Sequence, residues 1–105
     1  MIDEKASEHI KKAVEHELQN IQRNWGGTYH STHEAFAVLK EETEEAADAL
    51  DLLNSRLEQI WNDVKLNWDS DTTIYGAQQA AIALAEESVQ CAAVCMKFLE
   101  SIKKK

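Results

Sequence analysis

The stretch VLKEETEEAADALDLL, residues 38–53, decides the fold, because it joins a helical pattern to acids on the side that should be buried. Its apolar residues recur every three or four positions, as on one face of an α-helix. The stripe extends in both directions and comprises Ala35, Val38, Leu39, Ala46, Ala49, Leu50, Leu53, Leu57, Ile60 and Val64. Glu42 and Glu45 lie on the same stripe. The sequence therefore predicts one long helix with two carboxylates facing inward.

The ends of this helix are marked by local signals. Ser31 followed three residues later by Glu34 is a capping-box signature, and NWDSDTT at 67–73 stops the pattern. An unbroken helix between them would be ~50 Å long, whereas a compact domain of this size spans about 30 to 35 Å. Two alternatives follow: the chain hinges near Asn54 and Ser55, or the distal part of the helix packs on a second subunit.

The remainder of the chain is also predicted to be helical. It has no proline, and its glycines are at 26, 27 and 76. An amphipathic pattern predicts a helix over 3–24, ended by the two adjacent glycines. A third helix is predicted over 72–103, capped by one of Asp69, Ser70, Asp71 or Thr72. We expect a single all-α domain, residues 1–105, of three or four long helices.

The third helix predicts self-association. VQCAAVCMKFL, residues 89–99, is apolar on almost every side, and three helices cannot surround one of their own number. We expect a homo-oligomer, a dimer by preference, with this helix at its centre. Cys91 and Cys95 share a helix face on which a disulfide is geometrically poor, so both are predicted to be buried free thiols.

Charge and hydropathy exclude several classes of function. The net charge is −8, from 19 acidic against 11 basic residues, which argues against nucleic-acid binding because phosphate backbones are gripped by clustered Lys and Arg. No apolar run is long enough for a bilayer, and the first residues lack the layout of a signal peptide. A cytoplasmic protein without a membrane partner is the expectation.

Glu42 and Glu45 are the anomaly on the stripe, because burying an unpaired carboxylate costs several kcal/mol. Basic partners, protonation or a divalent cation could neutralise them. Lys40, Arg56 and Lys97 are predicted to lie at borders or outside, which favours Mg²⁺ or Mn²⁺. Of the neighbouring acids, Glu44 is predicted to face solvent, while Glu41 and Asp48 lie at the edges and could support a site.

The third helix offers a matching acid. Glu87 belongs to an apolar row and is predicted to face inward, with Glu86 and Gln90 beside it. Glu42, Glu45 and Glu87, together with Gln90, are therefore expected to converge between two packed helices, with Glu86 as a supporting residue. The competing interpretation is a solvated acidic face, since glutamate is a good helix former.

HEAFAVLKEETEE, residues 33–45, with EExxE at Glu41, Glu42 and Glu45, resembles the first half of the metal motif of MazG-like all-α nucleoside triphosphate pyrophosphohydrolases. It is even more similar to small phage and prophage proteins related to that superfamily, whose QVAAM-like helix has its counterpart in VQCAAVCMKF, residues 89–98. The resemblance covers residues 28–100. It implies a MazG-like antiparallel helical bundle, here completed by oligomerisation.

The resemblance also implies an ExxE…ExxD set whose carboxylates bind Mg²⁺, which holds a triphosphate and activates water to release pyrophosphate. Glu42 and Glu45 match the first pair and Glu87 the third acid. Gln90 stands where the family has aspartate, and the gap between the two halves is longer than is usual. An amide offers an oxygen without negative charge, which weakens the site.

Two functions follow from these patterns. One is a Mg²⁺-dependent nucleoside triphosphate pyrophosphohydrolase in which Trp25, Tyr29, His30 and His33 are candidate nucleotide contacts. The other is a non-catalytic, oligomeric binding or assembly protein of phage or mobile-element origin that keeps the fold with a degenerate metal site.

Overall fold

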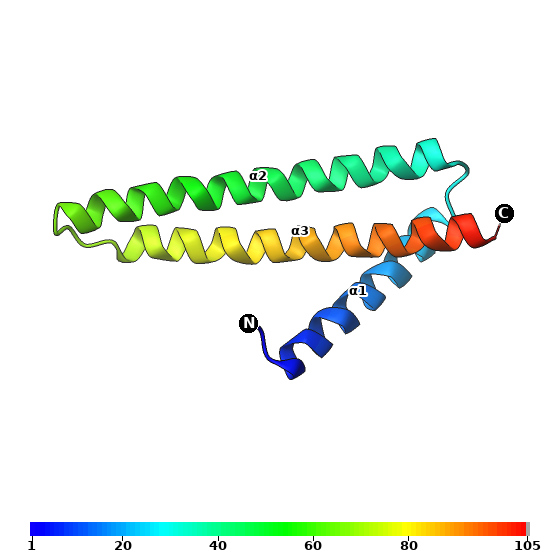
Figure 1. Cartoon of the computed structure of the whole chain (residues 1–105), viewed down its shortest axis with the longest axis horizontal. Helices are drawn as coiled ribbons and strands as arrows, with labels where there is room; N and C mark the ends of the chain where they lie inside the picture. Colours follow the sequence, from blue (N-terminus) through cyan, green and yellow to red (C-terminus); the bar gives the residue numbers. More distant parts are fainter. Residues whose placement is uncertain (105) are drawn as a thin grey trace.

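The computed structural model describes residues 1–104, and these form three helices and no strand, which confirms the all-α prediction. Helix α1 spans Glu4–Trp25, α2 spans Thr32–Lys65 and α3 spans Asp71–Lys103. Helices α2 and α3 lie side by side as a long antiparallel hairpin, and α1 crosses α3 obliquely towards the C-terminal end (Figure 1). Lys105, the last residue of the predicted domain, lies outside the described residues.

The helices begin and end where local chemistry requires it. Ser31 Oγ accepts a hydrogen bond from the backbone N–H of Glu34 at 3.1 Å, and Glu34 Oε1 accepts one from the N–H of His30 at 3.3 Å. The predicted capping box is therefore formed, but the Glu34 side chain binds the backbone N–H of His30, one residue before the N-cap Ser31. Gly26 ends α1 at φ = 92°, a conformation that favours glycine. Asp69 accepts from the N–H of Asp71 at 3.0 Å at the start of α3.

Helix α2 runs without interruption through Asn54 and Ser55 for 34 residues, so the chain does not hinge there. The molecule is accordingly elongated, with extents of 60 × 31 × 23 Å and a radius of gyration of 17.5 Å. A compact chain of this length would have a radius of gyration of about 13 Å. The long hairpin, rather than a folded-back bundle, sets the shape of the single chain.

The hydrophobic core lies at the open end of the hairpin. Buried Tyr29, Ala35 and Val94 pack there, and Ile21 and Phe98 are among the half-buried side chains against them. The backbone N–H of Tyr29 donates to Ser101 Oγ at 2.8 Å, and Ser101 Oγ donates to the carbonyl of Lys97 at 2.8 Å. These bonds fix the α1–α2 loop onto α3 and so position the residues around it.

The closed end of the hairpin leaves large apolar side chains in contact with solvent. We call this region the apolar arm; it comprises exposed Leu50, Leu52, Leu57, Trp61, Val64, Leu66, Trp68, Ile74, Tyr75 and Ile82. The predicted α2 stripe is thus only partly covered: Leu53 and Ile60 are half-buried, while Leu57 is 61% exposed. Two helices side by side can cover only one side of each other.

The same open packing overturns the expectation for the cysteines. Both thiols are free, but Cys91 is half-buried and Cys95 is exposed. Helices α1 and α2 both contact α3 yet leave part of its circumference uncovered, and Cys95 lies there. The prediction of two buried thiols is therefore wrong for the single chain.

Candidate metal centre and adjoining cavity

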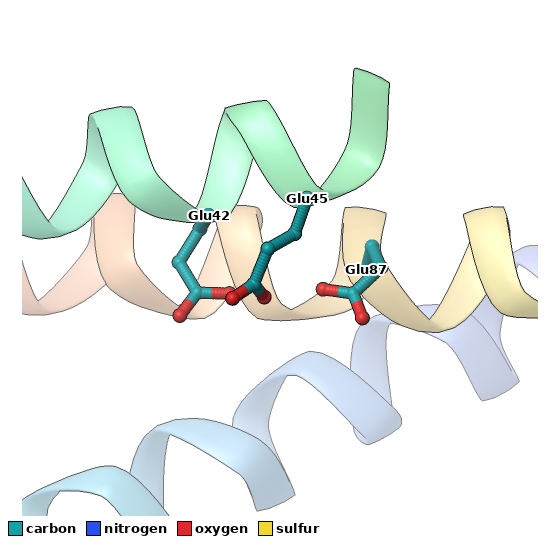
Figure 2. A group of neighbouring side chains, drawn as sticks. All are labelled: Glu42, Glu45 and Glu87. Atoms are coloured by element: carbon teal, nitrogen blue, oxygen red, sulfur yellow. The ribbon is translucent and has the colours of Figure 1, made fainter. Parts of the chain in front are cut away.

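Three carboxylates converge midway along the hairpin. Glu42 and Glu45 project from successive turns of α2 towards Glu87 of α3 (Figure 2). One oxygen from each lies within 4.8 Å of the others. Two oxygens bound to one Mg²⁺ at ~2.1 Å each can be at most ~4.2 Å apart. Small rotations of the exposed Glu45 side chain would bring this acid cluster, Glu42, Glu45 and Glu87, to the distances that one cation requires.

The acid cluster brings three carboxylates together between α2 and α3. Burial, followed by the charges of Glu45 and Glu87, raises the pKa of Glu42. Burial also raises the pKa of Glu87, and a hydrogen bond with Glu45 and its charge add to the effect. Glu42 Oε2 is buried and has no hydrogen-bond partner. Such an oxygen gains from a proton or a cation, and a carboxylate set suits a hard divalent ion.

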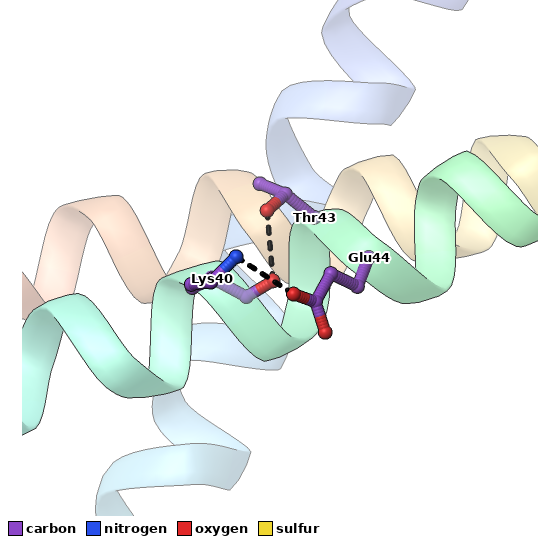
Figure 3. Close-up of polar contacts among 3 residues, drawn as sticks. All are labelled: Lys40, Thr43 and Glu44. Carbon is purple, nitrogen blue, oxygen red and sulfur yellow. Dashed lines mark hydrogen bonds and ion pairs between the residues drawn. The ribbon is translucent and has the colours of Figure 1, made fainter.

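The lysine nearest in sequence is engaged on the other side of α2. Lys40 Nζ forms an ion pair with Glu44 Oε1 at 2.8 Å, and Thr43 Oγ1 donates to the carbonyl of Lys40 at 2.8 Å (Figure 3). Both charged side chains are mostly exposed, so Glu44 faces solvent as predicted. A further ion pair joins Lys11 and Glu8 on the surface. Neither of these ion pairs involves a residue of the acid cluster.

A cavity of about 660 Å³ adjoins the acid cluster and is walled by all three helices. Glu41, Glu42 and Gln90 line one end of it, so Gln90 and the supporting acid Glu41 are placed beside the cluster. Glu34 and Lys97 line the other end. Glu86 and Gln90 line a second cavity of about 370 Å³ on the α1 side, and exposed Asp48 lines neither.

Lys97 contradicts the prediction that it lies at a border or outside. It is 1% exposed, and its Nζ lies 4.2 Å from the centroid of the Tyr29 ring. Burial lowers its pKa, and the charge of Glu34 opposes this effect. The prediction failed because the α1–α2 loop folds over this turn of α3, a long-range arrangement that helical periodicity does not reveal. The available signal was a lone lysine within the apolar run at 89–99.

Two of the four candidate nucleotide contacts line the cavity, and two do not. Trp25 and Tyr29 line the cavity, whereas exposed His30 and His33 do not. The indole of Trp25 is 80% exposed and offers an open ring face. Tyr29 has one face covered by Lys97, and its hydroxyl is buried without a hydrogen-bond partner. Trp25 is thus the stacking candidate, and Tyr29 is instead a candidate hydrogen-bond donor.

Comparison with known proteins does not extend this description. No protein-family model, curated protein or solved structure matches the chain. Within residues 1–104, no helix combines the length and the hydropathy that a bilayer-spanning segment requires. The acid cluster and the adjoining cavity are therefore the structural features from which a function can be proposed.

Proposed function

We propose that the protein is a Mg²⁺- or Mn²⁺-dependent nucleoside triphosphate pyrophosphohydrolase that converts a nucleoside triphosphate and water into a nucleoside monophosphate and pyrophosphate. The proposal is carried by one observation: carboxylate oxygens from two helices meet within 4.8 Å beside a cavity. The unpartnered Oε2 of Glu42 supports a role in ligand binding rather than in the fold. The MazG-like resemblance of residues 28–100 supplies the reaction class.

The side chains have distinct roles in this proposal. A divalent cation held by Glu42, Glu45 and Glu87 supplies charge neutralisation on the phosphate oxygens and polarisation of the attacking water. Gln90 contributes a neutral amide at the position of the family's aspartate. Glu41 is exposed and lines the same cavity, and in this proposal it would accept the proton of the attacking water.

The apolar arm favours a second candidate, a non-catalytic oligomeric assembly protein with a degenerate site. Leu50, Leu57, Trp61 and Val64 are all exposed and follow the spacing of one helix face. A homodimer in which two such faces pack together would convert two hairpins into a four-helix bundle. Dimerisation is compatible with both candidates, whereas the amide of Gln90 favours the non-catalytic one. Free Cys91 and Cys95 fit a cytoplasmic location.

Pyrophosphate release distinguishes the two candidates. The protein is incubated with a panel of ribo- and deoxyribonucleoside triphosphates in the presence of Mg²⁺ or Mn²⁺, and then with the metal chelated. Glu42→Gln should lower turnover by about 100-fold or more, because it removes a cation ligand. Glu44→Gln is the matched control on the opposite face of α2 and should retain activity. Absence of turnover with every nucleotide and either metal would leave the assembly role.

A further inference from the structure

We propose that the end of the cavity formed by Lys97, Tyr29 and Glu34 recognises a keto nucleobase, guanine or uracil/thymine, in preference to adenine or cytosine. This inference deepens the proposed function and rests on it for the placement of the phosphates at the acid cluster. It names the class of base that the site selects.

Two hydrogen-bond donors at this end have no acceptor among the residues that the structure describes. The Lys97 ammonium contacts the face of the Tyr29 ring and makes neither an ion pair nor a hydrogen bond within residues 1–104. The Tyr29 hydroxyl is also buried and unpartnered. A buried polar group without a partner is costly, and both line the cavity. A ligand that presents an acceptor oxygen here would satisfy them.

The charges of the lining indicate a neutral acceptor rather than a second anionic group. Glu17, Glu34, Glu41 and Glu42 line the cavity together with Lys97, so carboxylates outnumber the ammonium. Phosphate oxygens can be accommodated at the acid cluster through a bound cation. At the opposite end they would face the carboxylate of Glu34, whereas a carbonyl oxygen would accept from Lys97 with less repulsion because it carries no net charge.

Lys97 and Glu34, a donor and an acceptor in the lining of one cavity, together select one hydrogen-bonding edge. Guanine and uracil present a carbonyl oxygen beside a ring N–H, which matches a donor beside an acceptor. Adenine and cytosine present an amino group beside an unprotonated ring nitrogen, so the same pair of side chains meets them in the wrong order. Glu34 is held close to the loop by its bond from the N–H of His30.

The dimensions of the cavity suit this arrangement. Gln90, beside the acid cluster, and Lys97 are two turns apart on α3, a rise of about 10 Å. A sugar and a base bridge a span of this order. Trp25, on the last turn of α1, places its exposed indole in the lining of the same cavity, where a base can stack on it.

The test measures binding and turnover separately. Dissociation constants are determined by calorimetry for Mg²⁺ complexes of the non-hydrolysable α,β-methylene analogues of dGTP, dUTP, dATP and dCTP. The wild-type protein should bind the guanine and uracil analogues at least about tenfold more tightly. Lys97→Met and Glu34→Gln should reduce this preference below about threefold, while the exposed control Lys40→Met should retain it.

Each outcome assigns success or failure to one proposal. A keto preference that Lys97→Met abolishes supports the inference even if cleavable nucleotides release no pyrophosphate, in which case the hydrolase proposal fails alone. Turnover without a base preference, or a preference that survives Lys97→Met, overturns the inference alone. No binding of any analogue overturns it too. Should Lys97→Met not fold, Tyr29→Phe, which removes only the unpartnered hydroxyl, is expected to weaken the same preference.

Discussion

The backbone N–H of Tyr29 donates to Ser101 Oγ at 2.8 Å, joining the loop after α1 to the last turns of α3 across a buried contact. The hydroxyl of Ser101 in turn donates to the carbonyl of Lys97 at 2.8 Å. One side chain thus satisfies a buried loop amide and holds the loop over Lys97. The cavity depends on this contact, because Tyr29 and Lys97 both belong to its lining.

Ser101→Ala should lower the free energy of unfolding by about 1 to 2 kcal/mol, since it leaves the N–H of Tyr29 buried without an acceptor. Urea denaturation measures the change. Ser88 is the matched control: its hydroxyl makes the same kind of bond to the preceding turn, to the carbonyl of Leu84, but in an exposed position. If Ser88→Ala costs as much as Ser101→Ala, the loop contact contributes nothing specific.

Gly26→Ala should destabilise the protein by about 1 kcal/mol or more, because residue 26 has φ = 92° and a side chain there is strained. Gly27→Ala should be nearly neutral, since an added Cβ at 27 meets no atom within 4 Å and the residue has no positive φ. Thermal unfolding of both variants checks this. Equal losses at the two positions would contradict the assignment of strain to Gly26.

Without divalent cations, the free energy of unfolding should fall as pH rises above 4.5, the ordinary pKa of a glutamate. The folded-state pKa values of Glu42 and Glu87 are raised, so the folded chain holds more protons than the unfolded chain across this window. The stability that Glu42 and Glu87 contribute is fully present below pH 4.5 and is lost as the pH rises through their folded-state pKa values. Melting temperatures across a pH series measure the slope.

Addition of Mg²⁺ at neutral pH should restore the lost stability, because the cation replaces the protons in the acid cluster. Glu42→Gln should flatten the pH dependence and abolish stabilisation by Mg²⁺, whereas Glu44→Gln should leave both intact. An unchanged response to Mg²⁺ in Glu42→Gln would show that the cation binds elsewhere.

Glutamate substitutions in the apolar arm should produce monomers. Leu57→Glu and Trp61→Glu place charge on the face proposed to pack against a second copy, where burial would cost several kcal/mol. Light scattering after size exclusion gives the mass. Ile2→Glu, at a position 60% exposed outside the arm, is the control and should keep the wild-type mass. A wild-type protein that is monomeric at high concentration excludes this interface.

The features that could be predicted from the sequence are those that depend on the spacing of residues along a single helix. Ser31 and Glu34 marked the start of α2, Gly26 the end of α1, and helical periodicity directed Glu42, Glu45 and Glu87 towards one place between α2 and α3. Whether that place holds a cation stays a prediction. These features depend on residues within a few turns, or on two helices that lie side by side.

The parts that sequence did not predict depend on how α1 lies. The burial of Lys97 and the cavity beside it arise because α1 and the following loop cross one side of α3, and crossing direction is not encoded in the periodicity of either helix. The exposure of Cys95 has the same origin on the uncovered side. Apolar periodicity shows which side chains favour burial, but it does not identify the surface that buries them.

The antiparallel hairpin also sets an order of assembly. Residues that face each other near the 66–70 loop are close in sequence, whereas Glu42 and Glu87 are far apart in sequence. Contacts at the closed end of the hairpin therefore have the smaller entropic cost of loop closure. Folding is therefore expected to start at the loop and to proceed towards the open end, with α1 docking last. Kinetic φ-values for Ile60→Val should then exceed those for Val94→Ala. In this order the acid cluster comes together only after half of the hairpin has formed, and the cavity is completed at the final step.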